Sequence, residues 1–172
     1  MKRCNVAWAS SLVWTAVALS FFVTEAVAWR ETAQTICEDE IGVPFLIVKG
    51  IVAVESEGDP YTLNVKIGKV WRAYRFEDEV STQLFLIEAL KETEHIDIGL
   101  MQIHWAVWKG HYQVQATDLV DLETNLKIGC DILRQELAGE GPLWRRIGRY
   151  HSRTPHLNET YALKVLHASL QR

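Results

Sequence analysis

The chain has 172 residues, 48% of them hydrophobic, a length and composition that suit one domain with a substantial core. Its formal net charge of -4 at pH 7 excludes the broad basic surface that attracts nucleic acid. Residues of both charges are interspersed, without long runs of one sign. We therefore expect one folded domain that does not bind nucleic acid.

Residues 1–28 have the pattern of a cleavable secretory signal peptide. Lys2 and Arg3 form a positive start, residues 6–23 are almost wholly apolar or small, and residues 26–28 are Ala-Val-Ala, a typical cleavage site. A retained membrane anchor is the alternative, since the apolar run is near the lower length limit for spanning a bilayer. We expect export to the periplasm and a mature domain of residues 29–172.

Cleavage would remove Cys4 and leave Cys37 and Cys130. An even pair in an exported chain indicates one disulfide, and its long loop suggests a contribution of about 3–4 kcal/mol. Two buried free thiols are the alternative. Neither cysteine has the Cys-x-x-Cys spacing of a redox or zinc site.

Residues 31–40 predict a short polar helix, which ends at the Gly42-Val43-Pro44 segment. Residues 45–56 predict a central helix whose continuous apolar character indicates that protein surrounds it. Residues 61–75 predict a small β-hairpin with its turn near Gly68. Residues 77–92 predict a helix with one apolar face, formed by Val80, Leu84, Ile87 and Leu90.

The second half of the chain is predicted to be mostly helical. A short apolar run at residues 96–104 is broken by Gly99. Asp121 suits the N-cap of a helix over residues 122–137, and Pro142 suits the start of another helix. Residues 152–155 predict a turn, and Asn158 is the predicted cap of the last helix. The expected class is mainly α, with one small β element.

Glu55 occupies an unusual place, at the end of the predicted central helix and just before the turn at residues 58–60. A carboxyl group between an apolar core and a cleft is harder to ionise, so its pKa is raised. Such an acid can protonate a leaving oxygen near neutral pH. The alternative is a surface acid that happens to end a helix.

Four motifs follow one another along the chain: Ala-Val-Glu-Ser at residues 53–56, Gly-Leu-Met-Gln-Ile at 99–103, Asn-Leu-Lys-Ile-Gly at 125–129 and Gly-Arg-Tyr-His at 148–151. In this order they resemble the lytic transglycosylase family with the goose-type lysozyme fold, also called the SLT domain. The likeness is greatest to the small periplasmic transglycosylases of secretion, conjugation and pilus systems. It implies a lysozyme-like α+β domain with an active-site cleft at the C-terminal end of the buried central helix.

The resemblance also implies roles for individual residues. Glu55 matches the single catalytic acid, and Ser56 matches the hydroxyl that helps to orient it. Met101 and Gln102 match the segment that lines the sugar cleft. Tyr150 matches the tyrosine whose hydroxyl points at the catalytic acid.

Asn125 and Gly129 match a structural motif that packs a helix close to the cleft. Two positions depart from the family pattern. His104 stands where relatives often have Asn, and His151-Ser152 stands where larger members have Asn-Ala-Gly. The second departure is shared by secretion-associated relatives and so points to that subgroup.

The implied reaction cleaves the MurNAc-(β1,4)-GlcNAc bond of peptidoglycan glycan strands and leaves a 1,6-anhydroMurNAc end. It would open the wall locally for a type IV or type III secretion, conjugation or pilus machine, whose components are candidate partners. No cofactor is implied. No metal site is expected either, since none of the six histidines has a ligand-type spacing.

Two other functions remain open from the sequence. A hydrolytic muramidase would need a second carboxylate, for which Asp97 is the best placed candidate, while Glu57 and Asp59 point elsewhere or shape the turn. A non-catalytic wall-binding assembly protein would not need its catalytic motifs intact. One of Trp105 and Trp108 is expected to contact sugar, and the arginines at 145, 146, 149 and 153 are expected either to bind acidic groups of the wall or to form a solvated helix face.

Overall fold

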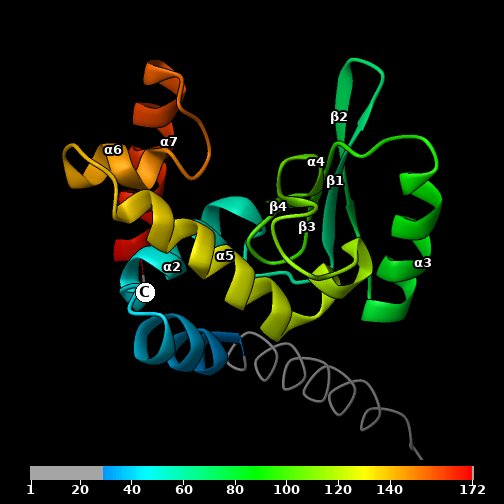
Figure 1. Cartoon of the computed structure of the whole chain (residues 1–172), viewed down its shortest axis with the longest axis horizontal. Helices are drawn as coiled ribbons and strands as arrows, with labels where there is room; N and C mark the ends of the chain where they lie inside the picture. The colour runs from blue at the N-terminus through cyan, green and yellow to red at the C-terminus, as the bar shows by residue number, and fades with distance from the viewer. Residues whose placement is uncertain (1–28, 172) are drawn as a thin grey trace, which may run out of the picture.

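The computed structural model describes residues 29–171, so the predicted signal peptide lies outside the described residues. Helices gather on one side of the molecule and a small sheet lies on the other (Figure 1). The helical part contains the π-helix η1 (Gln34–Glu40) and the α-helices α2 (Phe45–Glu55), α6 (Leu143–Gly148) and α7 (Pro155–Leu170). None of the helices within residues 29–171 is long and apolar enough to cross a membrane. The predicted class, mainly α with a small β element, is confirmed.

The sheet has four antiparallel strands in the order β2-β1-β3-β4. The predicted hairpin is confirmed as β1 (Thr62–Ile67) and β2 (Val70–Arg75), which are joined by a turn at Gly68. The run after residue 95, left without an element by its sequence, adds β3 (Ile96–Ile98) and β4 (Ile103–His104). The short helices α4 (Trp105–Trp108) and η2 (Ala116–Val120) follow.

Helix α2 ends one residue earlier than predicted, and protein does not surround it. Val48, Ile51 and Val52 are buried against the neighbouring helices, whereas Leu46 on another face is 53% exposed. The apolar composition of the helix could not distinguish burial on all sides from burial on one side. Ser56 caps the helix, so Glu55 is its last residue.

The predicted helix over residues 122–137 is confirmed as α5 (Leu122–Leu137). The carboxylate of its N-cap, Asp121, accepts a hydrogen bond from the backbone N–H of Thr124 at 2.9 Å, which satisfies one of the free donors of the first turn. The predicted disulfide is also confirmed. It joins Cys37 on η1 to Cys130 on α5 and so ties two elements that are 93 residues apart in the sequence.

Helix α3 (Glu79–Leu90) lies on the outer side of the sheet, but its predicted inward face was wrong. Val80, Leu84 and Ile87 are 65%, 62% and 46% exposed. The buried residues are Thr82 and Leu86 on another face. This helix carries apolar residues on both sides, and spacing alone does not say which side meets the sheet.

Helix α7 begins at Pro155, inside the predicted turn, and Thr154 is its N-cap. The prediction that Asn158 caps this helix was therefore wrong. Asn158 is buried in the first turns, where its side-chain amide donates to the carbonyls of Arg145 and Ser152 at 3.0 and 3.1 Å. Asn158 thereby fixes the connection between α6 and α7, which is a packing role that only the tertiary structure reveals.

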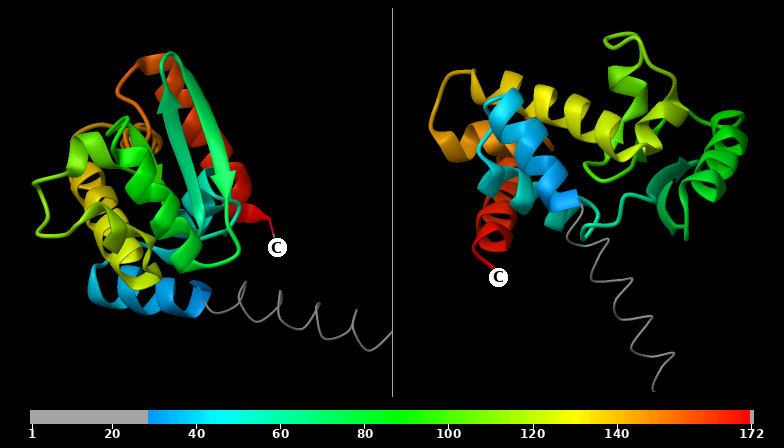
Figure 2. Two further views of the ribbon diagram at one scale, coloured as in Figure 1. Left: turned by 90° about the vertical axis from the view of Figure 1, so that its right-hand side faces the viewer. Right: turned by 90° about the horizontal axis from the view of Figure 1, so that it is seen from below.

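The buried apolar residues form two clusters, one in the helical part and one under the sheet. Helix α5 belongs to both, because it extends from the helical part toward the sheet side (Figure 1, Figure 2). Leu126 and Leu133 contribute to the first cluster, whereas Ile128 and Ile132 contribute to the second. The partly buried ring of Tyr150 packs against both clusters.

Candidate active site

Glu55 lies where α2 ends and the chain turns toward the sheet. The next residue, Ser56, is buried, and its hydroxyl donates to the carbonyl of Leu100 at 2.7 Å. Glu57 and Gly58 have positive φ angles of 59° and 89°, so the chain leaves the helix sharply. Ser56 therefore joins the end of α2 to the segment 99–102.

The carboxyl group of Glu55 is held by Tyr161 of α7. The Tyr161 hydroxyl donates to Glu55 Oε1 at 2.7 Å. Burial raises the pKa of Glu55 from 4.5 to about 7; the hydrogen bond from Tyr161 opposes this rise, and the negative charge of Asp97 adds to it. Glu55 therefore carries its proton over a large part of the neutral range, as its sequence position predicted.

The imidazole of His151 stacks on the ring of Tyr161, with centroids 4.8 Å apart and an angle of 8° between the planes. Burial lowers the pKa of His151, the negative charge of Asp97 opposes this, and Lys164 adds to the lowering. The stacked ring fixes the orientation of Tyr161 and hence of its hydroxyl. Tyr161 was not predicted from the sequence as a site residue, because a tyrosine on the inner face of a helix is ordinarily a core residue.

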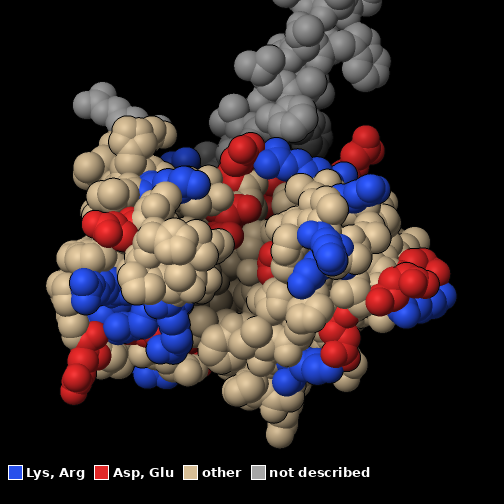
Figure 3. Space-filling view, turned by 90° about the horizontal axis from the view of Figure 1, so that it is seen from above, with Lys and Arg blue, Asp and Glu red and all other residues tan. Residues whose placement is uncertain are grey.

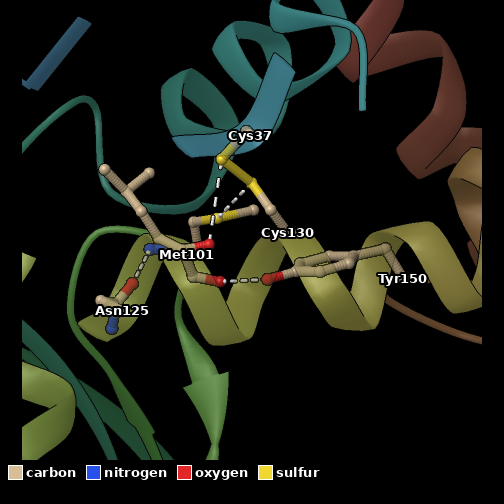
Figure 4. Close-up of a disulfide and its surroundings, with 6 residues drawn as sticks. Cys37, Met101, Asn125, Cys130 and Tyr150 are labelled. Atoms are coloured by element: carbon tan, nitrogen blue, oxygen red, sulfur yellow. Dashed lines mark hydrogen bonds between the residues drawn. A yellow bond between two sulfur atoms is a disulfide. The ribbon is translucent and has the colours of Figure 1, made fainter. Parts of the chain in front are cut away.

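Tyr150 differs from its predicted orientation. Its hydroxyl donates to the carbonyl of Met101 at 2.8 Å, and not to Glu55 (Figure 4). Tyr150 is still close enough to Glu55 for that carboxylate to raise its pKa, although burial is the larger cause. Two tyrosines therefore share the role assigned to one: Tyr161 binds the acid, and Tyr150 holds the loop beside it.

The segment 99–102 forms a tight turn next to Glu55. Gly99 has a φ of 76°, and a Cβ there would lie 2.3 Å from the Asn125 amide nitrogen, so both the backbone and the space require glycine. Gln102 has a φ of 49°, and its amide donates to the carbonyls of Gly99 and Thr62 at 2.8 and 3.0 Å. Gln102 thus fastens the turn to strand β1.

Met101 was predicted to line the sugar cleft, but its side chain is fully buried. Its sulfur lies 3.8 Å from Cys130 Sγ, beside the disulfide (Figure 4). A Cβ at Gly129 would lie 2.5 Å from the same sulfur, so the close approach of α5 depends on that glycine. Asn125 completes the support, because its side-chain oxygen accepts from the Met101 N–H at 2.8 Å. Met101 is therefore a supporting residue and not a ligand contact.

One face of the sheet carries Asp97. Asp97 Oδ1 accepts a hydrogen bond from His104 Nδ1 at 2.6 Å, and Oδ2 accepts from the Asn64 amide at 3.3 Å. Trp71 lies next to His104, with ring centroids 5.8 Å apart, and is 42% exposed. The Glu57 carboxylate accepts from Arg75 on β2 at 3.0 Å, so this face of the hairpin lies beside the end of α2.

The surface is hollowed between the helical part and the sheet part when the molecule is seen from above (Figure 3). Acidic atoms are visible within this hollow. Two pockets lie elsewhere, behind the sheet and against α3, and Glu55 lines neither: one of about 410 Å³ beside Val65 and Phe85, and one of about 500 Å³ beside Ile87 and Trp105.

The other residues selected from the sequence have internal partners. Trp105 and Trp108 pack against the cluster under the sheet. Two of the four arginines, Arg149 and Arg153, pair with Glu136, and the guanidinium of a third, at position 146, donates to the carbonyl of residue 137. Three of the four arginines thus have partners within the fold. In the described part of the chain, no three His, Cys, Asp or Glu side chains are grouped as a metal ion would require.

Comparisons with protein-family models, with curated proteins and with solved structures found no match. Any functional conclusion therefore depends on the four motifs and on the arrangement around Glu55.

Proposed function

We propose that this protein is a lytic transglycosylase that acts on peptidoglycan. The observation that carries the proposal is Glu55, a partly buried carboxyl at the end of α2 with a pKa of about 7 and a tyrosine hydroxyl on one oxygen. The hollow between the helical part and the sheet would be the substrate cleft of a lysozyme-like domain. A general acid for a glycosidic oxygen must remain protonated near neutral pH.

In the proposed reaction, Glu55 serves both steps. It first gives its proton to the glycosidic oxygen between N-acetylmuramic acid and N-acetylglucosamine, and the bond from that oxygen to C1 breaks. The N-acetyl carbonyl of the muramic residue stabilises the positive charge that develops at C1. The Glu55 carboxylate then takes the proton of the C6 hydroxyl, and the C6 oxygen bonds to C1 to give the 1,6-anhydro end.

A single carboxyl group can act twice only if its pKa suits both giving and taking a proton. A value near 7 meets this condition, whereas an ordinary glutamate near 4.5 would seldom hold the first proton. Tyr161 supports both steps, because its hydroxyl can donate to Glu55 Oε1 in either protonation state and stabilises the carboxylate after the first transfer. The other oxygen is left for the sugar.

The biological setting is part of the proposal. Export by the predicted signal peptide would bring the enzyme to the periplasm, where the wall lies and where the disulfide between Cys37 and Cys130 can form. There it would open the wall locally for an envelope-spanning secretion, conjugation or pilus apparatus. The proposed machine follows from the resemblance of the motifs to the small transglycosylases that accompany such systems.

The test is digestion of purified peptidoglycan with residues 29–172, followed by mass spectrometry of the released fragments. We expect fragments lighter by one water than the products of hydrolysis. Glu55→Gln should abolish their release while leaving the fold intact, and Glu57→Gln, which changes an exposed glutamate two residues away, should not. Substantial cleavage by Glu55→Gln would assign the acid to another residue. Hydrated ends from the unchanged chain would indicate a muramidase, and binding of the wall without cleavage would indicate an assembly protein.

A further inference from the structure

A second carboxylate, Asp97, lies on the sheet face that adjoins the end of α2. Asp97 shares this face with Arg75, whose guanidinium donates to Glu57, two residues after Glu55. The negative charge of Asp97 also raises the pKa of Glu55 and of Tyr150. In a hydrolytic mechanism such a group would take a proton from water. The proposed reaction consumes no water, so the state of Asp97 bears on which product forms.

Asp97 does not stand free, because both of its oxygens are hydrogen-bonded. Asn64, Asp97 and His104 are paired in register across β1, β3 and β4, so their side chains stand in a row on one face of the sheet. His104 Nδ1 lies 2.6 Å from Asp97 Oδ1. A carboxylate only accepts hydrogen bonds, so the Nδ1 atom must carry the hydrogen.

His104 is itself held on two sides. Its Nε2 atom lies 3.4 Å from Nδ1 of His95. Its ring also packs against the indole of Trp71, with centroids 5.8 Å apart. These contacts limit rotation of the imidazole and keep its Nδ1–H directed at Asp97.

We propose that His104 is a positioning residue that holds the Asp97 carboxylate against the sheet and so keeps it from turning toward a water molecule at the sugar. This inference rests on the proposed function. The internal C6 hydroxyl is then favoured as the acceptor at C1, because the sheet holds the Asp97 carboxylate away from water. Asn64 contributes the weaker, longer bond to the second oxygen of Asp97.

Without His104, the Asp97 carboxylate could turn away from the sheet and accept a proton from a water molecule at the sugar. The oxygen of that water would bond to C1, the glycosidic bond would break as before with the Glu55 proton passing to the leaving oxygen, and the water proton would go to Asp97. The product would then be a reducing end, heavier than the anhydro end by one water.

The test compares the ratio of hydrated to anhydro ends for four proteins: the unchanged chain, His104→Leu, His104→Asn and the double variant His104→Leu with Asp97→Asn. Leu removes the donor, whereas the Asn amide nitrogen can replace Nδ1. We expect the ratio to rise about tenfold or more in His104→Leu, in line with the usual contribution of a general base. It should stay unchanged in His104→Asn and return to the original value in the double variant.

An unchanged ratio in His104→Leu would overturn the inference, as would a raised ratio that persists in the double variant. Hydrated ends from the unchanged chain itself would refute the proposed function, which is a different result. A second measurement does not depend on turnover: nitrogen NMR of the unchanged protein should find a hydrogen on Nδ1 of His104. An Nδ1 atom without a hydrogen would overturn the arrangement, and this measurement decides if His104→Leu is inactive.

Discussion

The raised pKa of Glu55 should be visible in the stability of the protein without any substrate. A pKa of 4.5 in the unfolded chain and about 7 in the folded protein corresponds to about 3 kcal/mol, since each pKa unit is worth about 1.4 kcal/mol. The folded protein binds the proton more tightly than the unfolded chain. Its free energy of unfolding should therefore fall as the pH rises from about 4.5 to about 7, and then level off.

Glu55→Gln removes this titration, because the amide is neutral at every pH. The variant and the unchanged protein should be equally stable near pH 4, and the variant should be more stable by up to about 3 kcal/mol at pH 8. Urea denaturation across this pH range measures the difference. Glu57→Gln is the matched control, because Glu57 is exposed and paired with Arg75 at the surface. Equal stability of Glu55→Gln and the unchanged protein at pH 8 would refute the assignment of a costly buried charge to Glu55.

Cleavage of peptidoglycan should decline above about pH 7, where Glu55 loses its proton, and an activity that stays constant to pH 9 would contradict its role as the acid. Tyr161→Phe removes the hydrogen bond that lowers the pKa of Glu55, so the decline should move upward by about half a pH unit to one unit in the same assay. Replacing both Cys37 and Cys130 by Ala should lower the free energy of unfolding by about 4 kcal/mol in urea, because their bond closes a long loop; a loss below about 1 kcal/mol would contradict this. Gly129→Ala should cost about 1–3 kcal/mol in the same measurement, because its Cβ would overlap the methionine sulfur packed against it.

Local signals in the sequence predicted those elements whose cause is also local. Asp121 and the apolar spacing after it fixed both ends of α5, and the turn at Gly68 fixed the hairpin. The position of Glu55 followed from an apolar run that ends in a turn, and its environment agrees with that reasoning. The cysteine pair was predicted from the export signal and the even count.

The remaining features depend on contacts between distant segments. Residues 80, 84 and 87 have the spacing of a buried face, yet the sheet packs against another face of the same helix. The motif containing Tyr150 pointed to the right region, but Tyr161 reaches Glu55 because α7 packs along α2. The pairing of Asp97 with His104 arises from strand register, and β3 and β4 are too short to have been predicted from alternation.

Helix α5 couples the two halves of the molecule. It supplies side chains to the apolar cluster of the helical part and to the cluster under the sheet, so one helix belongs to both cores. Because both clusters hold α5 in place, unfolding of one cluster would also destabilise the other. The helix that carries Glu55 and the sheet that carries Asp97 therefore pack against clusters that share α5, and this helix sets their relative positions.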